Sequence, residues 1–356
     1  METSTALVAS SAVAVLVVVL VAQLEGEEVE RPLIPGIRFD VRSLTDVDAL
    51  NDYRFTGHQI IRIAHALRLP ECITTEARDC VNCYEALVMV LKRLAFPRRL
   101  SDLRKTFGRS NGVCYRVTLN VGTRLPSYKI AVTAASRNIV DGIALFIDGT
   151  KHFICRLSPR LDAPRGENLQ KVAYSGHKRR HCLSYRGVIV PDGLSISFWG
   201  PVEGRRHDTT LLRQSGLLGY VETHPVLRQL RFNIYGDPAY SVSDLISVPY
   251  QGASLTQDMK ACNALLSSLR VAEELGFNHI KRDFAHLEYV KAHKVRLSPV
   301  AVTVKCAVLF GNIHTCINKG NQISTMFQLK PPELEEYLLY ICSVHGFIEI
   351  LLRAGS

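Results

Sequence analysis

The sequence "YGDPAY", from Tyr235 to Tyr240, ends the apolar-leaning stretch "LRQLRFNIYG" with an aspartate between a glycine and a proline. A short apolar run bounded by turn residues predicts a buried strand. Asp237 then has two interpretations. Aspartate and proline are ordinary turn residues, but the end of a strand in an α/β sheet is also where functional sites are built. This segment alone favours the turn, so the rest of the chain has to decide.

A second apolar run, "NIVDGIALFIDGT", also ends on a carboxylate, Asp148, which is followed by Gly149. Two carboxylates at neighbouring strand ends would repel each other and raise the pKa of one of them. A divalent cation removes that penalty, and oxygen ligands with few histidines or cysteines nearby suit Mg²⁺ or Mn²⁺. We therefore predict that Asp148 and Asp237 lie at adjacent strand ends with their carboxylates about 4–7 Å apart, close enough to share a metal.

A third ligand is expected from a long helix over about residues 259–290. Helical spacing places Glu273 on an apolar face with Leu266, Leu269, Phe277 and Ile280, where an unpaired charge is costly. Glu274 is therefore the predicted ligand; the alternative is a surface helix with an Arg270–Glu274 pair. The polar face of the helix, on which Glu274 lies, comprises Asn263, Ser267, Arg270, Glu274, Asn278 and Lys281.

The surrounding sequence predicts a mixed α/β domain. Strand-like runs flank the turn Pro191-Asp192-Gly193, "HDTTLLRQSGLL" is helical, and another strand and helices follow. Upstream, residues 51–130 have a helical pattern, including "YEALVMVLKRLA". The stretch after it resembles a helix-turn-helix with basic residues around it, or a plain helical bundle with a solvated basic face. These basic residues are Arg109, Arg116 and Arg124.

The first 50 residues are expected to lie outside the folded domains. Ser4–Leu24 is uncharged and long enough to span a bilayer, which needs about 20 apolar residues. It is expected to be a helix that packs poorly on the rest of the chain, and it is interpreted as a transmembrane anchor, a weak signal sequence or an extension of low function. Residues 25–50, with "RPLIPG", read as a linker.

The bulk composition points to a globular protein with a polyanionic partner. The chain has 356 residues, a net charge of +10 and 47% hydrophobic residues. A basic surplus of this size favours nucleic acid, or an anionic membrane surface. The ten cysteines are irregularly spaced, so we expect reduced thiols rather than a disulfide framework, and no metal at Cys80 and Cys83.

A set of motifs then occurs in a specific order: "FIDGT", "YSGHKRRH", "PDGL", "GPVEGRRHD", "SGLL", "YGDPAY", "RVAEELGF" and "NIHTC". Together they resemble a PIF/Harbinger-type transposase of the DDE nuclease superfamily, from about Phe39 to Leu338. The resemblance implies a ribonuclease H-like fold with flanking helices over residues 138–325, followed by a tail over residues 326–356. It also implies a metal-dependent nuclease that cleaves DNA and transfers strands.

By position, the resemblance makes Asp148, Asp237 and Glu274 the catalytic residues and the metal ligands. Asp208, in "RRHDTTLL", matches a further acidic position, or alternatively caps the helix that follows it. Two departures, Glu273 where the family has an apolar residue and Asn278 where it has glycine, leave activity open.

The expected mechanism uses two Mg²⁺ about 4 Å apart, one activating water or a 3′-hydroxyl and one stabilising the leaving oxygen. Basic residues would contact DNA phosphates, and His177, His181 and His207 are expected to be phosphate contacts or loop residues rather than ligands. The basic residues assigned to DNA are Lys178, Arg179, Arg180, Arg205, Arg206, Arg109 and Arg116.

The competing hypotheses are a domesticated, inactive DNA-binding protein and a membrane-anchored protein of unrelated role. The family implies a nuclear location and, in many members, a separate Myb-like DNA-binding partner; a homodimer also stays open. A membrane location is the alternative if residues 4–24 are an anchor.

Overall fold

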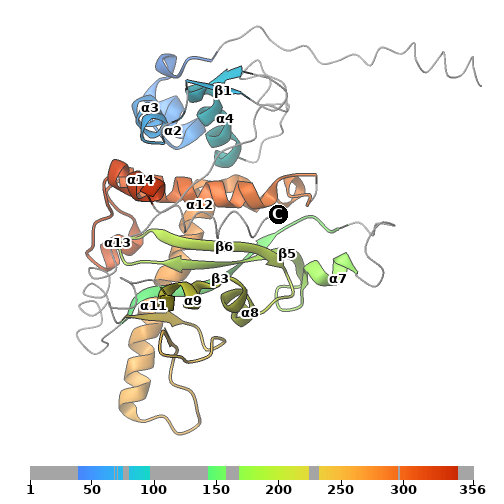
Figure 1. Cartoon of the computed structure of the whole chain (residues 1–356), viewed down its shortest axis with the longest axis vertical. Coiled ribbons are helices and arrows are strands. Elements are labelled where there is room, and N and C mark those ends of the chain that lie inside the picture. Colours follow the sequence, from blue (N-terminus) through green and yellow to red (C-terminus); the bar gives the residue numbers. More distant parts are fainter. Residues whose placement is uncertain are drawn as a thin grey trace, which may run out of the picture. The chain divides into compact units, whose positions relative to one another are not determined.

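The computed structural model describes residues 39–67, 69, 71–74, 80–96, 143–157, 168–223, 232–295 and 297–343 (Figure 1). The hydrophobic segment Ser4–Leu24 and the expected helix-turn-helix, with Arg109, Arg116 and Arg124, lie outside these residues. Those sequence predictions therefore stay predictions.

The N-terminal part of the described chain is helical. It contains η1 (Val41–Ser43), α2 (Asp46–Tyr53), α3 (Gly57–Ala66) and α4 (Cys83–Ala95), with a small antiparallel pair, β1 (Cys72–Thr74) and β2 (Cys80–Asn82). Helix α4 confirms the periodicity of "YEALVMVLKRLA".

Part of the range read as a linker is folded. Thr45 caps α2 by accepting a hydrogen bond from the Asp48 N–H, and this sets the start of the helix. Val41 and Ala49 are buried in the core. The folded region therefore begins before residue 50, because apolar side chains between the polar residues of this stretch pack against α3 and α4.

The cysteines are not all reduced, so that expectation was wrong for Cys72 and the cysteine bonded to it. Cys72 is disulfide-bonded. Cys83, Cys155, Cys182, Cys262, Cys306 and Cys316 are free thiols. Composition could not find the exception, because pairing depends on which strands the fold brings together.

A mixed sheet forms the centre of the following domain (Figure 1). Its main strands lie in the order β6-β5-β3-β7-β8, and β4 also pairs with β5. β3 is antiparallel to β5 and parallel to β7, so it joins an antiparallel half to a parallel half. The bounds are β3 (Ile143–Phe153), β4 (Tyr174–Ser175), β5 (Arg180–Ile189), β6 (Ser195–Glu203), β7 (Asn233–Gly236) and β8 (Ile246–Ser247).

The predicted hairpin is confirmed, since β5 and β6 pair on either side of Pro191-Asp192-Gly193. Gly193 has φ of 88°, a left-handed conformation that favours glycine. Asp192 Oδ1 accepts a hydrogen bond from the Leu194 N–H and fixes the same turn.

Helices flank the sheet. They are α7 (Leu169–Ala173), α8 (Asp208–Gln214), α9 (Leu217–Thr223), α11 (Gln257–Asp283), α12 (Val300–Ile317), α13 (Gln322–Met326) and α14 (Leu334–Ser343), with η2 (Ala285–Glu288) and η3 (Val290–Ala292). The long helix ends at Asp283 rather than near residue 290. The ring of Phe284 is fully buried and the backbone leaves helical geometry there, so two 3₁₀ turns follow.

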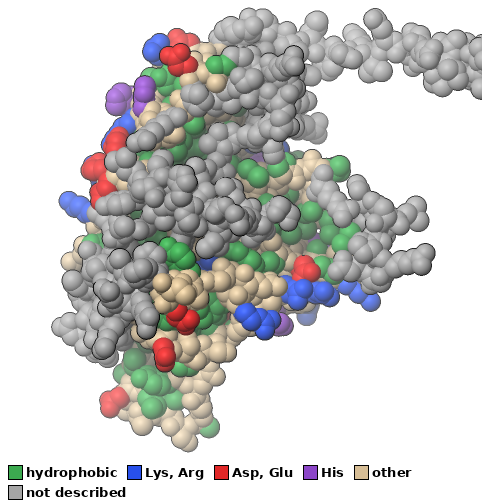
Figure 2. Space-filling view, viewed as in Figure 1, with side chains coloured by type: hydrophobic (Ala, Val, Ile, Leu, Met, Phe, Trp, Pro, Cys, Tyr) green, Lys and Arg blue, Asp and Glu red, His purple; other side chains and the backbone are tan. Residues whose placement is uncertain are grey.

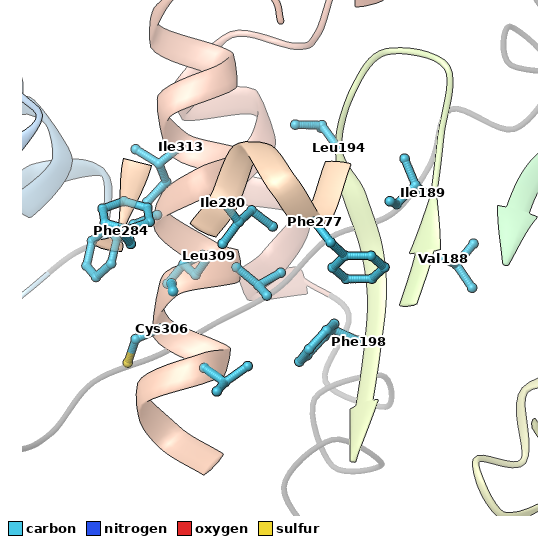
Figure 3. Close-up of a cluster of buried hydrophobic side chains, with 14 of the residues drawn as sticks. Val188, Ile189, Leu194, Phe198, Phe277, Ile280, Phe284, Cys306, Leu309 and Ile313 are labelled. Carbon is cyan, nitrogen blue, oxygen red and sulfur yellow. The ribbon is translucent and has the colours of Figure 1, made fainter. Parts of the chain in front are cut away.

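Helix α11 is packed against the sheet and α12 by the predicted apolar face (Figure 3). Phe277 lies over Gly187, where a Cβ atom would come 2.2 Å from the ring, and 5.9 Å from the Phe198 ring centroid. Ile280 lies against Gly311 of α12, where a Cβ atom would be 2.8 Å from the isoleucine side chain. Small residues therefore let α11 approach both layers closely.

Residues 327–338, which lie in the range expected to form a tail, contribute to this core. Phe327 is buried 5.6 Å from the Phe146 ring centroid. Leu334 and Tyr337 of α14 are buried too, and the Tyr337 hydroxyl accepts a hydrogen bond from Asn312 Nδ2. Within the described part of the chain, α12 alone has the length and hydropathy of a membrane span, and most of it is buried.

The architecture is thus a mixed sheet with flanking helices, which is consistent with the ribonuclease H-like α/β fold expected from the sequence.

Candidate functional site

Two aspartates meet where the parallel half of the sheet ends. In the register of β3 and β7, Ile147 pairs with Gly236, and the next residues along the two strands are Asp148 and Asp237. Their placement on adjacent strands confirms that part of the prediction. Asp148, however, is not at the end of its own strand, because β3 continues to Phe153 against β5.

Asp237 is both a turn residue and a neighbour of Asp148, so the two interpretations of its motif are compatible. Its Oδ1 accepts a hydrogen bond from the Ala239 N–H at 2.9 Å, and its carbonyl accepts one from the Tyr240 N–H at 3.1 Å. The aspartate therefore builds the turn that follows β7. The same turn holds its carboxylate beside β3.

Asp208 joins the pair from the start of α8. The alternative interpretation made Asp208 the cap of this helix. That interpretation is wrong, because the N-cap is His207. Its Oδ1 is buried and has no hydrogen-bond partner in the described part of the chain. The carboxylate lies directly over Gly149, where a Cβ atom would come 1.9 Å from Oδ1. A buried carboxylate oxygen without a partner is costly unless a cation or a water satisfies it.

The three aspartates interact electrostatically. The pKa of Asp148 is raised to about 6, chiefly by burial and also by repulsion from Asp208 and Asp237, while the Gly149 N–H and Arg270 oppose the shift. Burial also raises the pKa of Asp208, with a smaller contribution from Asp237, against the opposing charge of Lys151. Three carboxylates share one partly desolvated place.

This donor set fits a divalent cation. The oxygens are hard ligands, one of them has no partner, and a cation would cancel the repulsion that raises the pKa values. The residues that would hold it are Asp148, Asp208 and Asp237.

Glu274 is less closely connected to the three aspartates. It is exposed on α11 and makes no hydrogen bond or ion pair within the described part of the chain. Arg270, one turn earlier, is the residue of this helix that influences the charge of Asp148. The side chain of Glu273 lies outside the described side chains. The choice between the two glutamates therefore stays a prediction.

Lys151 is a site residue that sequence reasoning missed. Its Nζ donates hydrogen bonds to Ser184 Oγ at 2.7 Å, to the Arg206 carbonyl at 3.0 Å and to the Gly204 carbonyl at 3.3 Å. It therefore ties β3 to the loop that leads into Asp208, and its charge opposes the rise in the pKa of Asp208. Its position in "IDGTK", three residues after Asp148, was a usable signal.

Tyr240 and Arg186 are two further residues near the aspartates that sequence reasoning missed. Tyr240 is buried, its ring packs on Gly236, and burial followed by the charges of the three aspartates raises the pKa of its hydroxyl. Arg186 is also buried; it donates to Ser197 Oγ at 2.9 Å, and burial lowers its pKa to about 10. No sequence pattern distinguishes a buried arginine in a strand from an exposed one.

The two basic runs lie near each other, beside α8. Lys178 and Arg179 are exposed in the turn between β4 and β5, and the exposed Arg180, at the start of β5, lies 4.3 Å from the Phe153 ring centroid. The Arg205 N–H donates to the Val172 carbonyl of α7, so the loop after β6 is held close to that turn. Figure 2 shows Lys and Arg side chains gathered over this region of the surface. Arg206 also forms an ion pair with Glu203.

Comparison with known families and proteins bears on this site. A family model of DDE superfamily endonucleases matches residues 147–310, which include Asp148, Asp208, Asp237 and Glu274. The match supports a nuclease like that of DDE transposases. No curated protein matches the chain, and no solved structure matches it.

Proposed function

We propose that the chain is a divalent-metal-dependent DNA endonuclease of the DDE type, derived from a PIF/Harbinger-like transposase. The observation that carries the proposal is the unpartnered, buried Oδ1 of Asp208 beside Asp148 and Asp237. Three carboxylates placed close together repel one another, which destabilises the fold. A bound divalent cation would turn the same arrangement into a favourable one. The family match over residues 147–310 supplies the reaction class.

The chemistry divides between cation and protein. When bound, Mg²⁺ or Mn²⁺ would activate a water or 3′-hydroxyl and stabilise the leaving oxygen of the phosphodiester. Asp148, Asp208 and Asp237 hold the charge that binds the cation. Lys151 fixes the backbone before α8, so it positions Asp208. Below pH 6 the pKa of Asp148 makes its protonation compete with cation binding.

DNA would lie over the exposed basic residues next to α8. Lys178, Arg179, Arg180 and Arg205 present exposed positive charge, which favours contacts with DNA phosphates. Binding by these residues weakens as salt rises, because counterions are released from the DNA. A nuclear location, a Myb-like partner and a homodimer belong to the same proposal and rest on the family resemblance.

The purified chain is expected to nick supercoiled plasmid DNA in MgCl₂ or MnCl₂ and to lose this activity in excess EDTA. Agarose electrophoresis of the nicked product measures it, and restoring Mg²⁺ should restore cleavage. A protein that binds DNA in a gel-shift assay but never nicks it would instead be the inactive DNA-binding protein, which is the second candidate function.

Replacing Glu274 with glutamine is expected to abolish Mg²⁺-dependent nicking, because the amide lacks the charge that the cations require. Glu273→Val is the matched control on the neighbouring position and should cleave at the wild-type rate. Loss of activity in the Glu273 variant together with a silent Glu274 variant would show that the ligand assignment on α11 is wrong.

A further inference from the structure

A second cluster of ligand-type side chains lies away from the three aspartates, at the C-terminal ends of α11 and α12. His279 and Asp283 are four residues apart on α11, so they share one face of the helix, and His314 comes from α12. Each imidazole Nδ1 lies 2.9 Å from the same oxygen, Asp283 Oδ2. The three ligand atoms all lie within 4.8 Å of one another.

The three atoms have no hydrogen-bond partners outside the cluster among the described residues. Other contacts hold the side chains in place from outside. Phe55 packs edge-on against His314 with centroids 5.6 Å apart, and Arg54 Nε donates to the Asp283 carbonyl at 2.9 Å. Arg282 Nε lies 3.6 Å from the other carboxylate oxygen, Oδ1. Oδ2 is thus left facing two imidazole nitrogens.

The spacing is close to that of a metal site. Zinc binds imidazole nitrogen at about 2.0–2.1 Å and carboxylate oxygen at about 2.0–2.2 Å, so tetrahedral ligands lie about 3.3 Å apart. The observed separations of 2.9 Å need to open by only a few tenths of an ångström. His314 is partly exposed, which leaves a path for entry and room for a water as the fourth ligand.

We propose that His279, Asp283 and His314 bind one divalent transition-metal ion, best matched by Zn²⁺. Two imidazoles and one carboxylate prefer such an ion over Mg²⁺, which takes oxygen ligands. The ion would join α11 to α12 next to the N-terminal helices, through Phe55 and Arg54. It would therefore brace the helix that carries Arg270 and Glu274 without taking part in cleavage.

The test uses the full chain carrying Asp148→Asn and Asp208→Asn, so that the aspartate site cannot supply the signal. Isothermal titration with Zn²⁺ is expected to give one bound ion per chain, and Co²⁺ should give the visible absorption of a site with nitrogen ligands. Adding His314→Gln is expected to weaken Zn²⁺ binding by more than about 100-fold, since it removes a direct ligand. His58→Gln, at an exposed histidine of α3, is the matched control and should bind as before.

Circular dichroism of each variant separates loss of binding from loss of fold, and the Co²⁺ spectrum of the parent chain tests the site without the His314 change. Zn²⁺ should also raise the melting temperature of the parent and leave that of the His314 variant unchanged. The proposal is overturned if the parent binds no Zn²⁺, or if His314→Gln leaves binding intact; the cluster is then a hydrogen-bonded His–Asp–His clasp. None of these readouts requires cleavage, so the proposed nuclease function can fail independently.

Discussion

Replacing Asp208 with asparagine is expected to reduce Mg²⁺-dependent nicking about 10³-fold, as replacing Asp148 is, because a bound cation contributes several kcal/mol to the transition state. The substitution keeps the shape of the side chain and removes the charge. His207, not Asp208, is the cap of α8, so the helix should stay folded. Initial rates on supercoiled plasmid measure the effect, with circular dichroism confirming the fold.

Asp258→Asn is the matched control, because Asp258 is an exposed carboxylate in the first turn of α11. It tests whether loss of one negative charge alone changes DNA cleavage, and its rate should equal that of wild type. If Asp208→Asn cleaves at the wild-type rate, Asp208 is not a ligand. The unpartnered Oδ1 of Asp208 would then not indicate a cation site.

Gly149→Ala is expected to lower the rate of cleavage nearly as much as Asp208→Asn does, although it removes no charged group. The added Cβ would lie 1.9 Å from Asp208 Oδ1, so either the carboxylate must leave its place or α8 must move away from β3. Overpacking of this kind costs about 1–3 kcal/mol of stability. Nicking assays and urea unfolding together measure the two effects.

Gly219→Ala is the control for this change, since a Cβ at Gly219 meets no atom within 4 Å and the position lies in the exposed part of α9. Full activity in Gly219→Ala beside a large loss in Gly149→Ala would tie the effect to Asp208. A Gly149→Ala protein that cleaves normally would mean that the carboxylate has freedom to move.

The sequence predicted the local features well, because they depend on neighbouring residues. The Pro191-Asp192-Gly193 turn, the α4 periodicity and the apolar face of α11 all follow from spacing along the chain. It also predicted that Asp148 and Asp237 lie on adjacent strands.

What the sequence left undecided depends on contacts between distant segments. In the sequence, Asp208 could be either a helix cap or a metal ligand. Because α8 begins at Asp208 itself and His207 is its N-cap, the structure excludes the cap. The contacts of Lys151 and Arg186 form only when the strands come together, since Lys151 bonds Ser184 of β5 and Arg186 bonds Ser197 of β6. His279 and His314 lie on different helices, so only the packing of α11 against α12 brings both of them to Asp283.

The mixed sheet has a consequence for the order of folding. The antiparallel pairs form between strands that are closer in the sequence than β3 and β7: β5 and β6 are joined by a tight turn, and β3 is separated from β5 by fewer residues than from β7. The parallel partner of β3 arrives only after α8 and α9 have been made, and closing that longer loop costs more entropy. A chain growing on a ribosome can therefore pair β3, which carries Asp148, with β5 before Asp237 has been made. On the proposed function, the cation site would be completed late in synthesis, after the basic residues from Lys178 to Arg206 have been made.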